Sequence, residues 1–187
     1  MTAITIKNNF SFEEYLTYDD GTDDRYELVD GELILMNPPT GRHSLIIFGL
    51  TEIFMTEIRQ QNLPWIALQM FGVRTAHRRS RLPDLCVMTL EIAQELRDVS
   101  AVLDSGALLV VEVVSPDSGT TDYRYKRTEY AAAGIPEYWI IDPLQNKVSI
   151  LQLVEGLYEE QTYQEDEVVR SPLLPELAIT PQQIFQV

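Results

Sequence analysis

The run LLVVEVVSP at residues 108–116 constrains the fold more than any other stretch of the sequence. Apolar residues fill both alternating sets of positions, which is typical of a strand that is covered on both faces of a sheet. Glu112 lies in the middle of this run. A carboxylate in such surroundings is normally paired, hydrogen-bonded or bound to a cation. The fold must therefore supply a partner for Glu112.

A second acid occurs in a similar run, RLPDLCVM at residues 81–88, where Asp84 stands among aliphatic residues. The two acids are 28 positions apart, which leaves ample chain for a return connection. Asp84 and Glu112 can therefore meet on adjacent or nearly adjacent strands. Alternatively, each acid lies at a strand end and is capped by an arginine or by backbone amides.

The remaining patterns predict an α/β (α+β) fold: a mixed β-sheet flanked by helices, with a β-hairpin extension at the N-terminus. Asp30-Gly31 is a strong signal for a two-residue hairpin turn. The expected elements are the hairpin at residues 25–36, a helix at 43–61 with one buried face, a strand at 65–75, a helix at 123–134, and strands at 137–142 and 147–154.

Length and composition narrow the class of protein. A chain of 187 residues is long enough for one sizeable core and short for two, so we expect one domain over residues 1–187. Neither a membrane-spanning run nor a secretory signal is visible, which predicts a cytoplasmic protein without a membrane partner. Cys86 is the one cysteine, which excludes an internal disulfide and a cysteine-rich zinc site.

The net charge of −15 opposes broad affinity for nucleic acid, because such affinity depends on neutralising phosphates with Lys and Arg. The positions of the cations are more favourable to nucleic-acid binding than the net charge is, since half of the 14 Lys and Arg lie in two segments next to the acidic strands. A hairpin tip and a solvated helix face would explain the same clusters. The residues expected to contact nucleic acid are Arg74, Arg78, Arg79, Arg81, Arg124 and Arg127.

Pro83-Asp84 on one strand and Glu112 in VEVVSP on the next resemble the PD-D/ExK nuclease superfamily. The motifs YELVDGELILMNPPTGRH, PDLCVM, VVEVVSP and DYRYKRTEYAAAGIPEYWIIDP, in this order, are similar to those of the Uma-two family of endonucleases. The resemblance covers about residues 25–155. It implies a restriction endonuclease-like fold with metal-binding acids on two neighbouring strands.

The resemblance also implies a set of site residues. Asp84 and Glu112 would bind Mg²⁺, for which Mn²⁺ could substitute. The superfamily's simplest motif has a lysine two residues after the glutamate, where this chain has Val114, and the lysine that fits instead is Lys126 on the following helix. A surface lysine remains the alternative. Arg124 and Arg127 are rival cations that suit phosphate binding better than activation of water.

Two further residues are candidates with open alternatives. Glu27 in the predicted hairpin is either an acid that supports the site, an additional metal ligand, or a surface charge. His43 at the start of the first long helix either aids the site or makes a structural hydrogen bond.

The implied activity is metal-dependent hydrolysis of phosphodiester bonds in nucleic acid, with DNA the favoured substrate. Cleavage of a duplex needs two active sites or two visits, which makes a homodimer plausible. Two alternatives stay open. The chain could be a noncatalytic, nuclease-like interaction module, or a metal-dependent phosphohydrolase that acts on a small nucleotide.

Overall fold

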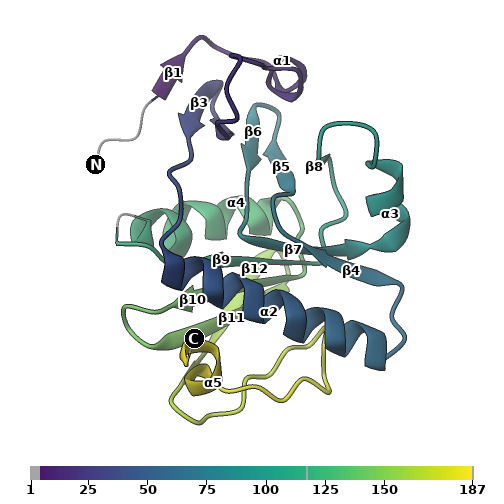
Figure 1. The fold of residues 1–187 in the computed structure, drawn as a ribbon, viewed down its shortest axis with the longest axis vertical. Helices are drawn as coiled ribbons and strands as arrows, with labels where there is room; N and C mark the ends of the chain where they lie inside the picture. Colours follow the sequence, from purple (N-terminus) through teal and green to yellow (C-terminus); the bar gives the residue numbers. More distant parts are fainter. Residues whose placement is uncertain (1–4, 117, 187) are drawn as a thin grey trace.

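The computed structural model describes residues 5–116 and 118–186, and these residues form two six-stranded mixed sheets flanked by helices (Figure 1). The strand order is β1-β3-β2-β6-β5-β8 in the first sheet and β12-β11-β10-β9-β7-β4 in the second. The strands are β1 (Thr5–Lys7), β2 (Tyr26–Val29), β3 (Glu32–Leu35), β4 (Trp65–Leu68), β5 (Gly72–Ala76), β6 (Arg79–Arg81), β7 (Leu85–Thr89), β8 (Val102–Leu103), β9 (Leu109–Val113), β10 (Glu137–Asp142), β11 (Lys147–Val154) and β12 (Leu157–Gln164).

One long helix covers a face of the second sheet (Figure 1). It begins after Thr40, whose side-chain oxygen accepts a hydrogen bond from the backbone N–H of His43. Its apolar residues recur at helical spacing, as the sequence predicted. The helices are α1 (Phe12–Leu16), α2 (Gly41–Gln60), α3 (Leu90–Glu95), the π-helix η1 (Thr121–Lys126), α4 (Arg127–Ala132) and α5 (Pro181–Phe185).

Strand β9 is buried on both faces, as its sequence predicted. Val111 and Val113 pack into the core that α2 covers, whereas Val110 packs into a second core with Tyr130 of α4. Strand β9 runs parallel to β10 and antiparallel to β7. The side chain of Glu112 therefore points, by alternation, to the face of the sheet that carries α4.

The predicted fold class is confirmed, but the structure has two mixed sheets where the sequence predicted one. The run at residues 65–75 was expected to be one strand, and it is divided into β4 and β5 at a bend where Met70 has a φ of 66°. The run at residues 81–88 is divided between β6 and β7, because Pro83 cannot donate to a strand ladder. At these two breaks the chain passes between the sheets.

The predicted hairpin of β2 and β3 is confirmed, with Asp30 and Gly31 both at positive φ in its turn. Strand β6 pairs with β2, so the hairpin forms part of a complete sheet rather than a separate extension. Among the described residues, no helix has the length and apolar character that crossing a membrane requires.

Candidate active site

Glu112 meets its partners on the face of the second sheet that carries α4. Its side chain is buried, and one carboxylate oxygen lies 2.7 Å from the Lys126 ammonium. The other accepts a hydrogen bond of 2.6 Å from the Tyr130 hydroxyl. Both partners come from one continuous helical segment, η1 followed by α4. The fold thus supplies the cation and the donor that a buried carboxylate requires.

Asp84 lies at the break where the chain enters β7. Leu85 pairs with Val111 of the antiparallel strand β9, so Asp84 is placed opposite Glu112 at the next position. One Asp84 oxygen accepts a hydrogen bond of 2.7 Å from the backbone N–H of Val113, and the other lies 2.8 Å from Nε2 of His43. The Asp84 side chain is 24% exposed, whereas Glu112 is buried. The site therefore opens toward solvent on the side of Asp84.

Lys126 is buried among three carboxylates. Its Nζ lies 2.7 Å from Glu112, 3.3 Å from Asp122 and 3.7 Å from Glu27. Within η1, Asp122 and Lys126 turn inward while Arg124 and Tyr125 are exposed. Asp122 was not among the residues selected from the sequence. The signal that could have identified it is an acid four positions before the lysine on one helix.

Glu27 is buried on β2 and is not a surface charge. One of its oxygens lies 2.7 Å from the Arg81 guanidinium, and the other accepts a hydrogen bond from the backbone N–H of Leu82. Arg81 also binds Glu129 of α4 through two of its nitrogens. Glu129 is a second acid that sequence reasoning missed, because the pairing joins two elements that are far apart in the chain.

The pKa shifts follow from burial and from these contacts. Burial raises the pKa of the Glu112 carboxyl well above its usual range; Lys126 opposes the change, and the neighbouring carboxylates add to it. Burial would lower the pKa of Lys126, but Glu112, Glu27 and Asp122 together raise it. Burial would likewise raise the pKa of Glu27, which Lys126 and Arg81 hold below its usual range. Lys126 is therefore charged, and negative charge is in excess around Glu112.

The four clustered arginines do not form one exposed basic patch. Arg81 was expected to contact nucleic acid, but it is buried between Glu27 and Glu129 and does not lie on the surface. Arg79 binds Asp30 of the β2–β3 turn, and Arg78 donates to the backbone carbonyl of Phe10. These arginines join parts of the fold, and their intramolecular partners explain their clustering.

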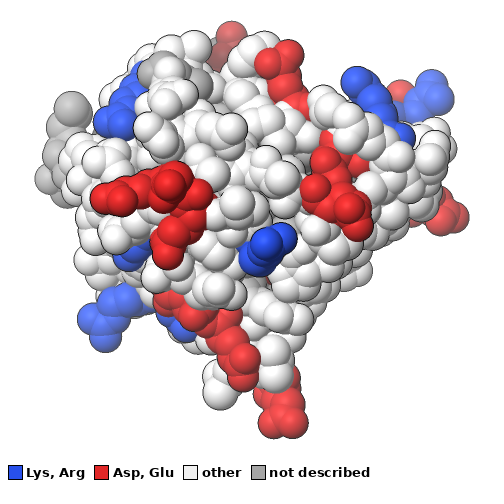
Figure 2. All heavy atoms as spheres, turned by 90° about the horizontal axis from the view of Figure 1, so that it is seen from below, with Lys and Arg blue, Asp and Glu red and all other residues white. Residues whose placement is uncertain are grey.

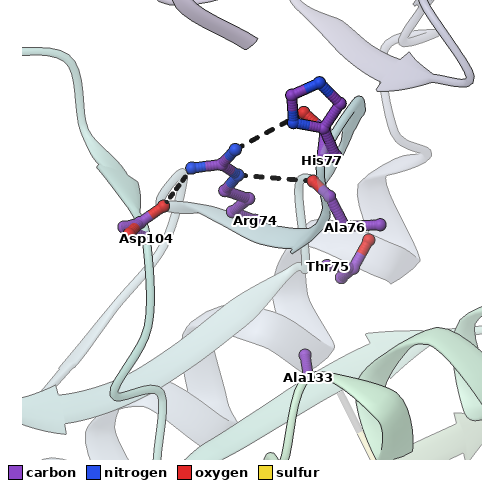
Figure 3. Close-up of a pocket in the computed structure, with 6 residues that line it drawn as sticks. All are labelled: Arg74, Thr75, Ala76, His77, Asp104 and Ala133. Carbon is purple, nitrogen blue, oxygen red and sulfur yellow. Dashed lines mark hydrogen bonds and ion pairs between the residues drawn. The ribbon is translucent and has the colours of Figure 1, made fainter.

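Arg74 borders an open pocket of about 280 Å³ on the first sheet (Figure 3). Its guanidinium binds Asp104 at 2.6 Å, donates to the Ala76 carbonyl, and lies 4.2 Å from the centre of the Phe12 ring. Arg127 is held in a similar way by Glu160. Arg124 is exposed on η1, two residues before Lys126.

The surface charge agrees with the acidic composition of the chain. The face seen in Figure 2 carries several separate groups of Asp and Glu, with fewer Lys and Arg between them. Like charges on this face repel the phosphates of a nucleic acid.

The donor set around Asp84 and Glu112 suits a hard divalent cation. Among residues 5–116 and 118–186, no group of three or more His, Cys, Asp and Glu side chains is arranged to hold an ion alone. Mg²⁺ does not need such a cage, since it binds through one or two carboxylates and completes its shell with waters and substrate phosphate. Each carboxylate oxygen that has one hydrogen bond keeps a second lone pair. The residues therefore fit a hydrated Mg²⁺.

Comparisons with known proteins show the fold and the family of the chain. In the crystal structure of "a putative nuclease belonging to DUF820 from Anabaena variabilis ATCC 29413", the chain is 20% identical to this one and superposes with a TM-score of 0.78, over 94% of this chain and 97% of that one. At this identity the likeness shows the fold. No curated protein sequence matches the chain. Residues 12–182 match the Uma2 family, described as "Putative restriction endonuclease". The chain belongs to the Uma2 family.

Proposed function

We propose that this protein is a metal-dependent endonuclease that hydrolyses phosphodiester bonds in nucleic acid, with DNA as the favoured substrate. The observation that carries the proposal is the position of Lys126, 2.7 Å from Glu112, which is itself opposite Asp84 on the neighbouring strand. The strand register that sets Asp84 opposite Glu112 and the ion pair of Glu112 with Lys126 together support this proposal. The description of the Uma2 family supports the same activity.

Asp84 and Glu112 would hold Mg²⁺ or Mn²⁺ through their carboxylate oxygens. When bound, such an ion lowers the pKa of a bound water and offsets the charge that develops on phosphate oxygens. Lys126 would orient the attacking water or stabilise the same developing charge with its ammonium group. His43, 2.8 Å from Asp84, would fix the orientation of that carboxylate.

The unequal exposure of the site residues indicates the side from which the substrate would approach. Asp84 and His43 are 24% and 17% exposed, whereas Glu112 and Lys126 lie deeper. A phosphate would therefore approach from the side of Asp84 and meet Lys126 last. The exposed Arg124 on the same helical segment could contact a neighbouring phosphate.

Cleavage of supercoiled plasmid tests the proposal. We expect nicked and linear products with Mg²⁺ or Mn²⁺, none with EDTA, and none from Asp84→Asn or Glu112→Gln. Asp104→Asn is the control, because this exposed acid lies outside the site and binds Arg74. If wild-type protein leaves both DNA and RNA intact under all these conditions, the proposal is wrong.

The two alternatives have separate outcomes in the same experiment. Turnover of nucleotides without plasmid cleavage would support a phosphohydrolase, for which an acidic surface is less of a handicap. A noncatalytic module is favoured by one observation, namely that every carboxylate oxygen of Asp84 and Glu112 already has a protein partner. Inertness combined with the absence of metal binding would support that module.

A homodimer belongs to the same proposal, because cleavage of both strands of a duplex needs two sites or two visits. Sedimentation analysis of the free protein and of the DNA complex would test it. A protein that stays monomeric in both states and still linearises plasmid would show that one site makes both cuts.

A further inference from the structure

Glu27 and Glu112 compete for one cation. Both carboxylates are buried, and both lie within ion-pair distance of Lys126. The distances are unequal, since Lys126 is 3.7 Å from Glu27 and 2.7 Å from Glu112. A carboxylate attracts an ammonium group less strongly when another cation already pairs with it, so the longer distance to Glu27 points to a second cation beside that carboxylate.

Arg81 accounts for the inequality. It binds Glu27 at 2.7 Å, on the oxygen that does not face Lys126. The other Glu27 oxygen accepts a hydrogen bond of 3.1 Å from Leu82. The negative charge of Glu27 is thus compensated by Arg81 even without Lys126. Glu112, in contrast, has Lys126 as its only charged partner within ion-pair distance among the described residues.

Glu129 fixes the position of Arg81. Two guanidinium nitrogens of Arg81 bind the two Glu129 oxygens, at 2.7 and 2.6 Å. Thr75 donates a further hydrogen bond to Glu129, and Arg79 lies 3.4 Å from it. This planar, two-point pairing leaves Nη1 of Arg81 directed at Glu27.

We propose that Arg81 is a positioning residue: held by Glu129, it neutralises Glu27 and so keeps the Lys126 ammonium on Glu112. This inference rests on the proposed function, because it assigns Arg81 a role in placing the cation that acts on the phosphate. Without Arg81, Glu27 would have no cation within ion-pair distance except Lys126 among the described residues, and the ammonium would shift toward it. A displacement of this kind costs rate, since catalytic groups act only within a narrow geometry.

Arg81→Met tests the proposal in combination with Glu27→Gln. We expect Arg81→Met to lower kcat for plasmid cleavage by on the order of tenfold to a hundredfold. Adding Glu27→Gln removes the competing charge and should recover most of that loss. The matched control is Glu57→Gln on the Arg81→Met background, because Glu57 is also a buried glutamate but lies on α2 beside Gln61. This control should recover nothing.

A second readout does not depend on activity. The chain contains three lysines, Lys7, Lys126 and Lys147, so NMR of ¹⁵N- and ¹³C-labelled lysine side chains gives few signals. Loss of one signal in Lys126→Met assigns the resonance of interest. We expect this resonance to shift in Arg81→Met and to return toward its wild-type position when Glu27→Gln is added.

The outcomes separate this proposal from the proposed function. If wild-type protein cleaves nothing, the endonuclease assignment is wrong, and the lysine resonance still decides whether Arg81 positions Lys126. If Glu27→Gln restores thermal stability but neither kcat nor the resonance, Arg81 is only structural and the proposal is overturned. Should Arg81→Met fail to fold, Arg81→Gln permits the same comparison, since glutamine removes the charge but keeps N–H donors that can bond Glu27 or Glu129.

Discussion

The Lys126 ammonium lies 2.7 Å from a carboxylate oxygen of Glu112, and both side chains are buried. The position two residues after Glu112 is Val114, which packs in the apolar core beneath α4. The cation beside Glu112 comes instead from η1. The role that the resemblance implies for Lys126, action on a metal-bound water, stays a prediction.

Replacement of Lys126 should lower the rate of cleavage without weakening the binding of DNA. We expect Lys126→Ala to lower kcat by on the order of a hundredfold, with little change in substrate affinity, because the ammonium acts mainly on charge that develops in the transition state. Lys126→Arg should not restore the rate, since a guanidinium is larger and spreads its charge. Single-turnover cleavage and DNA binding in Ca²⁺ would measure the two effects.

The stability of these variants must be followed in parallel. Removing Lys126 leaves Glu112 and Asp122 without their shared cation, so a lower melting temperature is expected. Lys126→Met keeps the volume and provides a second comparison. Lys126→Ala could instead cleave at the wild-type rate while Arg124→Ala or Arg127→Ala is inactive. This result would show that an arginine acts in place of Lys126, and it would leave the assignment of Asp84 and Glu112 unchanged.

Metal affinity should depend on Asp84 and Glu112 and much less on Lys126. We expect Asp84→Asn and Glu112→Gln each to weaken binding of Mn²⁺ by roughly tenfold or more, because each removes a negative ligand from a site that has few protein ligands. Isothermal titration calorimetry measures this directly. Asp104→Asn is again the control, and equal affinity in all four proteins would place the ion elsewhere.

The sequence predicted the fold class, the hairpin, α2 and the doubly covered strand, because these depend on local patterns of apolar residues and on turn residues. It did not predict the second sheet, since the crossings at Met70 and Pro83 occur within runs that each read as one strand. Long-range charge pairing was also hidden. From the sequence, Arg81 was predicted to belong to a basic surface. Its partner Glu129 is 48 positions later in the chain, so only the structure shows that the two side chains pair.

In the β2–β3 turn, Gly31 should tolerate a side chain less well than Gly156 does. Gly31 and Gly156 both have a φ of +84°, but a Cβ at Gly31 would overlap the Arg78 guanidinium, whereas Gly156 has open space. Gly156→Ala should cost about 1 kcal/mol of unfolding free energy from backbone strain alone. Gly31→Ala should cost about 1 kcal/mol more, because Arg78 loses its hydrogen bond to Phe10. Equal midpoints in urea would mean that Arg78 moves aside freely.

Salt dependence of DNA binding should distinguish arginines that meet phosphate from arginines that hold the fold. Arg124 is exposed on η1, whereas Arg74 is neutralised by Asp104 at 2.6 Å and packs over Phe12. Each phosphate contact contributes roughly 0.9 to the slope of log affinity against log salt concentration. We therefore expect Arg124→Gln to flatten that slope by about one and Arg74→Gln to leave it unchanged, as measured by fluorescence anisotropy in Ca²⁺. Arg81 is left intact in this series, because its replacement would disturb Glu27 and Lys126. If Arg74→Gln flattens the slope as much as Arg124→Gln, the ion pair with Asp104 opens on binding, and the first sheet takes part in contacting the nucleic acid.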